Sequence, residues 1–463
     1  GTGTGTASTG LTGNHHIHSG VRYTDRMRKD LQELRADATA AFEAAVSAVQ
    51  PANLVPNAVR IADDEVRIWD RPIPRVTGRR MVAAIGKAAP GLADAWLGLL
   101  PGWADDVFVL TTHGRAVTQR VTDTATVLYG GHPYPDADGE HAAARLLEMV
   151  RTLDGDDLLI VLLSGGGSAL LAAPEDGLTL DDVRATTEAL LSAGATINQV
   201  NAVRRQLLAA AGGGLGRTAF PAQVVTLVLS DVLGDPLPDI ASGPTVASPT
   251  TPADALGVLG GHGIVADVPP AVVDFLRSRI ETPTDDAWTD RTRIQVLANN
   301  RSAVTAAAEL LSSRDYHVLE HPGYLEGEAA DRGAMLGMFA SAFWAPRPVA
   351  FVVGGETTVT VRGQGVGGRN HELALAAALA AGDTSGWVVL AAGTDGVDGM
   401  ADAAGAVVDP TTVGRLAAAG MDASTALAEN DSGTALAAVG DAIRTGPTGT
   451  NVCDVTMVLT AAR

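Results

Sequence analysis

The chain has 463 residues, of which 46% are hydrophobic and 19% charged, and its formal net charge is −20. This length exceeds what one hydrophobic core serves, so we expect two domains of roughly 200 residues each. The sequence has no apolar run of 18 residues and no basic stripe, which argues against a membrane span and against nucleic-acid binding. The single cysteine, Cys453, excludes an intrachain disulfide and fits a reducing cytoplasm.

The first 20 residues are rich in Gly and Thr and lack an apolar signal core. We interpret residues 1–20 as a disordered leader or a tag remnant, with metal binding by His15, His16 and His18 as the other reading. From Asp30 to Val49 the apolar residues fall at helical spacing, which predicts an amphipathic helix.

Buried strands are predicted at 81–86, 105–114, 125–133, 158–164 and 224–231. Helices are expected from near Lys87, over 138–153 and over 201–211, and Thr179 with Asp182 suits a capping box. Continuous apolar strands that alternate with helices indicate a parallel sheet covered on both faces.

The polar stretch 281–293 is the expected domain boundary. We predict a first domain over 25–280 and a second over 290–463, with strands near 293–300, 348–361 and 387–396 and a helix from Ser302. The predicted fold class is therefore α/β, with two α/β domains, a mostly parallel first sheet and the active site in the cleft between the domains.

Glycine-rich and polar loops follow most of the predicted strands, where ligands bind in open α/β sheets. The loop Ser164, Gly165, Gly166, Gly167 and Ser168 offers free N–H groups and a helix start that can hold a phosphate. A turn that merely needs positive φ is the other reading. Leu170 breaks the GxGxxG pattern, and Ala88 after Gly86-Lys87 breaks the Walker A pattern.

Two cations stand out by their position. Lys87 lies at a strand-to-helix turn inside an apolar run, where it is either a phosphate clamp or a solvated lysine at a helix start. Arg369 follows the glycine-rich loop GQGVGG at a predicted helix start, where a cation is mildly unfavourable unless it has a function.

Carboxylates occupy three further loops. Asp395, Asp398 and Asp402 lie in GTDGVDGMAD, while Asp231 and Asp235 lie in SDVLGD and Glu356 in GGETT. Such oxygens suit Mg²⁺ or a general base, although turn-forming aspartates are common. His132 and the other histidines have no metal-ligand spacing, and no GxSxG elbow occurs.

Eight motifs in order resemble the ATP-dependent glycerate 2-kinase family: GKAAPG, GGHPYPD, LLSGGGSALL, LSDVLGDPLPDIASGPT, GGETTVTVRGQGVGGRNHELAL, AAGTDGVDG, ADAAGAVVD and TGPTGTNVCD. The resemblance covers nearly everything from about residue 30 onward. It implies a Rossmann-like first domain, a C-terminal MOFRL domain, ATP, Mg²⁺, and transfer to the 2-hydroxyl of D-glycerate to give 2-phosphoglycerate.

The resemblance also assigns the expected site. Lys87, Arg369 and Asp395 are expected to be catalytic, and Asp395 and Asp231 to bind the metal. The phosphates or nucleotide are expected at Ser164, Gly165, Gly166, Gly167, Ser168, Asp231, Glu356 and Gly368. The small hydroxylated substrate is expected at His132, Asn201, Arg204 and Asn370. A homodimer is left open.

Several positions depart from the family pattern. Gln206, Leu208 and Ala211 stand where His, Ser and Lys are usual, THGR at 112–115 replaces KYGH, and Gly433 replaces an aromatic residue. The resemblance implies that these segments lie near the cleft, so the changes favour a larger, less charged or more apolar acceptor than glycerate. The alternatives are thus a kinase with an altered acceptor, or a non-catalytic nucleotide-binding protein. A reductase is not favoured, because no dinucleotide fingerprint is present.

Overall fold

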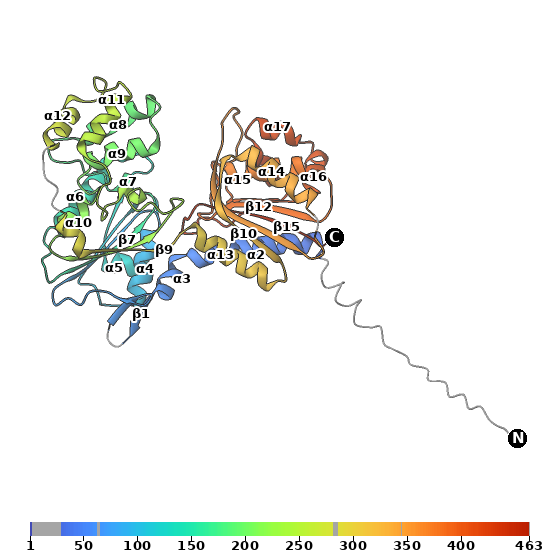
Figure 1. Cartoon of the computed structure of the whole chain (residues 1–463), viewed down its shortest axis with the longest axis horizontal. Coiled ribbons are helices and arrows are strands. Elements are labelled where there is room, and N and C mark those ends of the chain that lie inside the picture. The colour runs from blue at the N-terminus through green and yellow to red at the C-terminus, as the bar shows by residue number, and fades with distance from the viewer. Residues whose placement is uncertain (2–28, 63–64, 281–285, 344, 463) are drawn as a thin grey trace.

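The computed structural model describes Gly1 and residues 29–62, 65–280, 286–343 and 345–462. These residues form two α/β bodies, as Figure 1 shows. The predicted fold class of two α/β domains is confirmed. Apart from Gly1, the expected leader at 1–20 lies outside the described residues. Among the described helices, none is long and apolar enough to cross a membrane.

The first domain is built on six parallel strands in the spatial order β6-β5-β4-β7-β8-β9. Their bounds are β4 Arg80–Ile85, β5 Asp106–Thr112, β6 Thr126–Gly130, β7 Leu158–Ser164, β8 Gln223–Leu229 and β9 Thr292–Ala298. The chain runs outward in both directions from β4 and β7. This reversal makes a topological switch point, where ligands bind in sheets of this type.

Both faces of this sheet are covered, as its apolar strands predict. Val82 and Ala84 of β4 belong to one core, while Met81, Ala83 and Ile85 belong to the opposite one. The flanking helices are α3 Pro51–Ala58, α4 Ala89–Leu99, α5 Gln119–Thr124, α6 Ala137–Val150, α7 Gly167–Leu170 and α10 Gly214–Ala219. A small antiparallel sheet joins β1 Val59–Ala62, β2 Glu65–Ile68 and β3 Arg71–Pro72.

A helical lobe stands over one end of the first sheet (Figure 1). It contains α8 Leu180–Ser192, α9 Ile197–Leu207, α11 Pro252–Gly261 and α12 Pro270–Arg279, which share an apolar core of their own. The predicted capping box of Thr179 and Asp182 begins α8. Two short 3₁₀ helices, Ile240–Ser242 and Ala287–Arg291, complete the described helices of this domain.

The second domain has a mixed sheet in the order β10-β11-β15-β12-β13-β14, in which only β10 and β11 pair in parallel. The strands are β10 His317–Glu328, β11 Val349–Thr358, β12 Trp387–Gly393, β13 Gly405–Val408, β14 Ala442–Ile443 and β15 Asp454–Thr460. The helices are α13 Asn300–Ser313, α14 Ala329–Ala342, α15 Arg369–Ala381, α16 Thr412–Ala418, α17 Ala423–Ala428 and α18 Ser432–Ala438.

The first helix, α2 Leu31–Val49, belongs to this second domain. It lies beside α13 beneath the second sheet, as Figure 1 shows, and Phe42 is buried in their shared core. Arg35 on α2 also pairs with Asp409 and Asp441. The opposite face of the sheet is covered by α14 and α15.

The expected domain ranges therefore need two corrections. Residues 31–49, predicted in the first domain, pack on the second, and β9, predicted in the second, extends the first sheet beside β8. The polar stretch before β9 looked like a boundary, yet the chain leaves the first domain only after Ala298. Hydrophobic spacing gives the type of each element but not the sheet it joins, because pairing is a long-range choice.

Candidate functional site

The switch point of the first sheet brings Lys87 and the glycine loop together. The backbone N–H of Lys87 donates to the carbonyl of Gly165 at 2.8 Å, and the N–H of Ala88 donates to Oγ of Ser164 at 3.1 Å. Gly86 has φ of +119°, and a Cβ there would lie 2.3 Å from Oγ of Ser164. The two turns therefore fit together only with glycine at this position.

The loop after β7 leaves no room for side chains. A Cβ on Gly165 would lie 1.6 Å from Oδ2 of Asp231. Gly166 has φ of +86°, and its Cβ would lie 3.1 Å from Cγ of Lys87 and 3.2 Å from Cδ2 of His132. The positive φ bears out the turn requirement, and the close neighbours place three polar side chains around the loop.

Asp231 follows β8 and lies where the two domains meet. Burial raises the pKa of Asp231 to about 6, since Lys87 only partly offsets it and the charges of Glu356 and Asp395 raise it further. Its backbone carbonyl accepts a hydrogen bond from Sγ of Cys453 at 3.0 Å. Residues of the second domain thus surround a carboxylate of the first.

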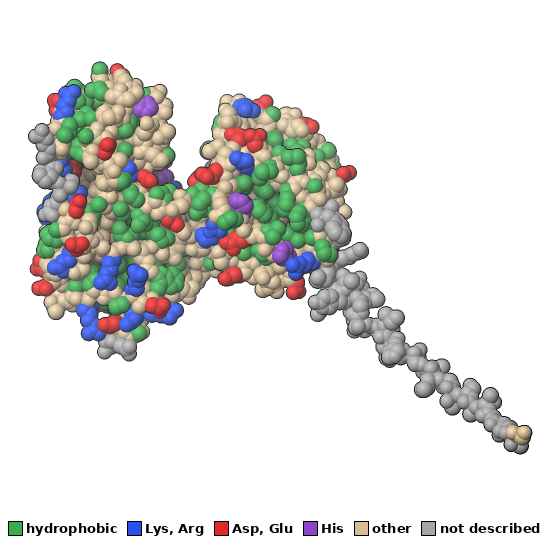
Figure 2. All heavy atoms as spheres, in the orientation of Figure 1, with side chains coloured by type: hydrophobic (Ala, Val, Ile, Leu, Met, Phe, Trp, Pro, Cys, Tyr) green, Lys and Arg blue, Asp and Glu red, His purple; other side chains and the backbone are tan. Residues whose placement is uncertain are grey.

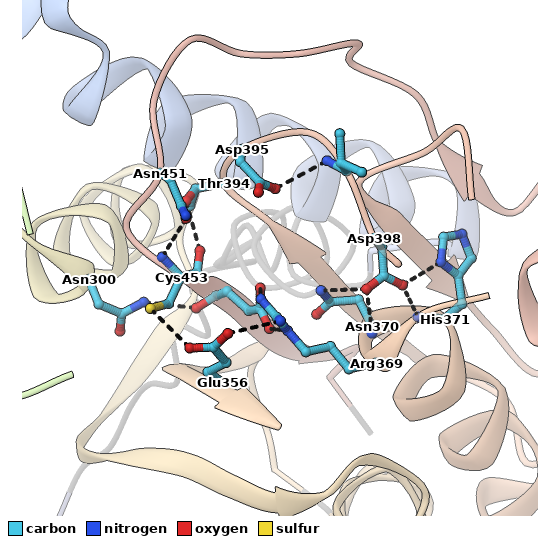
Figure 3. A network of polar contacts seen from close by, with 12 residues as sticks. Asn300, Glu356, Arg369, Asn370, His371, Thr394, Asp395, Asp398, Asn451 and Cys453 are labelled. Carbon is cyan, nitrogen blue, oxygen red and sulfur yellow. Dashed lines mark hydrogen bonds and ion pairs between the residues drawn. The ribbon is translucent and has the colours of Figure 1, made fainter. Parts of the chain in front are cut away.

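Arg369, at the start of α15, is fixed by two carboxylates. Its Nε and Nη2 donate to Asp454 at 2.5 and 2.9 Å, and Nη1 lies 2.9 Å from Oε1 of Glu356. Burial would lower the pKa of Arg369, but these ion pairs outweigh it and raise the pKa above its usual value. Burial also raises the pKa of Asp454 to about 6 despite the arginine. Figure 3 shows Arg369 beside Glu356 in this network.

Asp398 accepts hydrogen bonds from backbone N–H groups in the first turn of the same helix. Its Oδ1 accepts from the backbone N–H and the side chain of Asn370, and its Oδ2 accepts from the backbone of His371 and lies 2.5 Å from His371 Nδ1. Asn370 is only 1% exposed and binds Asp398 in this structure, and its contact with substrate stays a prediction. Gly368 is the N-cap residue and packs against Asp398.

Asp395 lies in the loop after β12, as predicted. Its Oδ1 accepts from the backbone N–H of Val397 at 3.1 Å. A Cβ on Gly393 would lie 3.1 Å from this oxygen and 3.3 Å from Oδ1 of Asp454, so the two carboxylates flank the same backbone position. Glu356 differs from its prediction in one respect, because it lies within β11 rather than in a loop after it.

His132 and Arg204 flank the glycine loop from two sides. Partial burial and the positive charges of Lys87 and Arg115 lower the pKa of His132 to about 4. Arg204 donates from Nη2 to the carbonyl of Ser168 at 2.9 Å and thus supports the loop from behind. Asn201 lies on α9 in the helical lobe, and the described residues show no hydrogen bond from its side chain.

Among the departures from the family pattern, Thr112, His113 and Arg115 of THGR line hollows beside Lys87, whereas Gln206, Leu208, Ala211 and Gly433 do not. Leu208 and Ala211 are 2% and 5% exposed in the core of the helical lobe, and Gln206 donates to the carbonyl of Thr250 at 2.7 Å. Gly433 is buried, and a Cβ there would lie 2.8 Å from the carbonyl of Val366. Leu208, Ala211 and Gly433 therefore do not contact the hollows beside Lys87, and the altered acceptor stays a prediction.

The carboxylates suit Mg²⁺ only in part. Within the described ranges, the one group of three ligand atoms close enough to share an ion is His113, Asp136 and Asp138, whose Asp136 caps α6. Asp231, Asp395 and Glu356 do not converge in that way. Mg²⁺ commonly takes one or two carboxylates and completes its shell with substrate phosphates and water. The mutual repulsion that helps raise the pKa of Asp231 fits a cation bound there.

Sequence reasoning missed Asp454 and Cys453 as site residues, although both lie in the motif TGPTGTNVCD. Asp454 is 85 positions from its partner Arg369, and Cys453 is 222 positions from Asp231. Burial and the nearby carboxylates raise the pKa of the Cys453 thiol. The available signal was only a polar loop that ends in a strand.

A deep notch separates the two domains, as Figure 2 shows. A hollow of about 540 Å³ lies in this region and is lined by Lys87, Arg115 and residues 447–449 of the second domain. Lys87, the glycine loop and Asp231 thus face Glu356, Arg369 and Asp395 across the junction. The arrangement offers two cations, a glycine turn and several carboxylates to an anionic ligand.

Family models match parts of both domains. Residues 37–277 match a family model described as a domain of unknown function, DUF4147, and residues 349–454 match the MOFRL family. D-glycerate 2-kinase of Thermotoga maritima is 38% identical over 384 residues, covering 81% of this chain and 89% of that protein. Glycerate 2-kinase of Pyrococcus horikoshii is 36% identical over 432 residues, covering 90% and 96%.

An Agrobacterium vitis protein provisionally named a hydroxypyruvate reductase is 40% identical over 409 residues, covering 87% of this chain and 92% of that protein. Among solved structures, the glycerate kinase of T. maritima superposes with a TM-score of 0.82 at 34% identity, covering 93% of this chain and all of that one. A P. horikoshii protein superposes with a TM-score of 0.80 at 33% identity, covering 94% and 99%.

Proposed function

The chain belongs to the glycerate 2-kinase family, whose members are phosphotransferases acting on an alcohol group, and from this premise we propose its reaction. The enzyme transfers the γ-phosphoryl group of ATP to the 2-hydroxyl of D-glycerate and releases ADP and 2-phosphoglycerate. The bond to the β-phosphate oxygen breaks, a bond to the acceptor oxygen forms, and the hydroxyl proton leaves to a base.

One observation carries the proposal. Lys87 lies over Gly166 at the switch point. Its charge lowers the pKa of Asp231, and the charges of Glu356 and Asp395 in the facing domain raise it. Phosphoryl transfer needs mainly positioning and charge neutralisation, and these parts provide both.

Each side chain then has a role. The N–H groups of Gly165, Gly166 and Gly167 bind phosphate oxygens, and Lys87 neutralises the transferred group. Asp231 would hold Mg²⁺, which supplies positive charge to the phosphates when bound. Asp395 accepts the acceptor's proton.

Arg369 acts from the second domain. In this structure the guanidinium of Arg369 is paired with both Asp454 and Glu356. To bind a phosphate, Arg369 must release the exposed Glu356, while Asp454 holds the guanidinium in place. Closing the notch between the domains would bring this cation to the ligand and exclude water.

The test is release of ADP with ATP and Mg²⁺ across D-glycerate, L-glycerate and other hydroxy acids and polyols, followed by phosphorus NMR of the product. We expect D-glycerate to be turned over to a 2-phospho product. Turnover of another acceptor alone would mean an altered acceptor. Oxidation of NADH with hydroxypyruvate, without ADP release, would instead favour a reductase.

Lys87→Ala supplies the residue-level test. The Lys87 side chain makes no ion pair or hydrogen bond within the described residues, so the variant should fold normally. We expect kcat to fall by at least about 100-fold because transition-state charge is left uncompensated. Lys29→Ala, which removes a partly buried lysine paired with Asp37 of the second domain, serves as a control away from the site and should keep kcat.

A further inference from the structure

Two hollows meet beside Lys87, and Arg115 lines both of them. The first, of about 540 Å³, extends to residues 447–449 of the second domain. The second, of about 500 Å³, is lined by polar side chains, among them Thr112, His132 and Tyr134. Arg115 follows β5, the strand next to β4, so its loop ends at the same edge of the sheet as Lys87.

Neither Lys87 nor Arg115 makes a direct ion pair in the part of the chain that the structure describes, although Asp231 is close enough to Lys87 to interact with its charge. Both side chains are half-buried, and no ion pair or hydrogen bond of either is found there. Both act on the same imidazole, since their positive charges help to keep His132 neutral. Two cations that converge in a chain of net charge −20 form an arrangement that a bound anion would stabilise.

We propose that Arg115 binds the carboxylate of the acceptor acid, with Lys87 at the border between this subsite and the phosphate-binding loop. This inference rests on the proposed function and names the part of the site that recognises the substrate. The planar guanidinium suits the two oxygens of a carboxylate. His132, which is neutral at physiological pH, adds a hydrogen-bonding group without a further charge.

The position of the hydroxyl follows from the chemistry of the acid. In a 2-hydroxy acid the hydroxyl stands on the carbon next to the carboxylate. An acid held at Arg115 therefore presents its hydroxyl toward Lys87 and Gly166, where the phosphoryl group is expected. The carboxylate of Asp94 also lines the larger hollow. Its negative charge repels a bound triphosphate more strongly than it repels the single carboxylate of an acceptor acid.

The experiment compares the intact enzyme with Arg115→Ala, Arg115→Lys and a control, Arg60→Ala, which changes an exposed arginine on β1. KM values for D-glycerate and ATP are measured separately, with glyceramide as an uncharged acceptor. In Arg115→Ala we expect KM for D-glycerate to rise by roughly 10- to 100-fold while KM for ATP stays unchanged. The preference for D-glycerate over glyceramide should fall by a similar factor, and Arg115→Lys should restore part of it.

Other outcomes overturn the inference. A rise in KM for ATP with KM for D-glycerate unchanged would mean that Arg115 binds a phosphate. Unchanged values for both would mean that Arg115 holds no ligand. If the intact enzyme does not turn over D-glycerate, the proposed function fails separately. In that case calorimetric binding of D-glycerate decides: binding that Arg115→Ala abolishes supports the subsite, and no binding refutes it.

Discussion

The buried charge of Asp231 lowers the folding stability of the protein at a position where we expect it to have a function. Its carboxylate packs against Gly165 and shares its surroundings with Glu356 and Asp395. A charge so placed is unfavourable in the folded protein, where burial raises its pKa to about 6. Carboxyl groups with shifted pKa values are typical of functional sites. A bound cation or ligand relieves the unfavourable electrostatic energy of such a group.

A neutral replacement should therefore stabilise the protein. The raised pKa means that the contribution of Asp231 to stability is fully present below about 3.8 and is lost as the pH rises through about 6. At about pH 7.5 the variant Asp231→Asn should be more stable by about 1 to 3 kcal/mol. Urea unfolding at about pH 7.5 and about pH 5 measures this gain, which should shrink at the lower pH. An equal gain in unfolding free energy at the two pH values would contradict this prediction.

The same variant should lose activity, since the asparagine cannot hold Mg²⁺ as a carboxylate does. We expect kcat to fall by at least about 100-fold. Asp254→Asn, which changes an exposed carboxylate of the α11 capping box, is the matched control and should keep kcat.

At the scale of elements, the turn between β7 and α7 has a sequence requirement that depends on its neighbours. Three glycines in a row look like a flexible linker. The structure shows instead that Asp231, Lys87 and Ala241 close the space around them. The motif was recognisable from the sequence, but the reason for each glycine lies on segments far along the chain.

Gly165→Ala should disturb this turn. Its Cβ would lie 1.6 Å from Oδ2 of Asp231, so either the carboxylate or the loop must move. We expect a loss of about 1 to 3 kcal/mol in unfolding free energy and of most activity. Gly257→Ala on α11, where nothing lies within 4 Å, is the control and should stabilise by about 0.5 to 1 kcal/mol. Normal ADP release by Gly165→Ala would show that the loop does not bind phosphate.

The start of α15 depends on Asp398 in a similar way. Asp398→Ala would leave the backbone donors of Asn370 and His371 unpaired in a buried place. Unfolding free energy should fall by about 2 to 4 kcal/mol, and Arg369 should lose its alignment. Asp422→Ala removes an exposed cap from α17 and should cost about 1 kcal/mol without affecting turnover. Equal effects of the two variants on kcat would contradict this account.

At the scale of the whole molecule, the chain crosses between domains more than once. Residues 31–49 form α2 in the second domain, the chain then builds the first domain up to β9, and it returns to the second domain with α13. The two crossings lie near residues 50 and 299, so the second domain is assembled from two segments that are distant in sequence. Such a connection couples the domains and suits a site that closes between them.

This topology predicts complementation between fragments. Residues 299–462 alone would expose the sheet face that α2 covers, so we expect this fragment to be unfolded or aggregated. Adding a peptide of residues 29–50 should restore its helical circular dichroism. The same peptide with Phe42→Asp should fail, because Phe42 is fully buried between α2 and the second domain. Independent folding of the fragment would show that α2 is dispensable.

The sequence by itself determined the α/β class, the α2 helix, the strands with their following glycine loops, and Lys87, Asp231, Arg369 and Asp395 as candidates. These features are local, because apolar spacing and turn residues act over a few positions. Tertiary structure alone decided that β9 joins the first sheet, that Asp454 holds Arg369, and that Leu208 and Ala211 are core residues. Each of these features depends on which distant segments pack or pair with one another. Local periodicity does not contain that information.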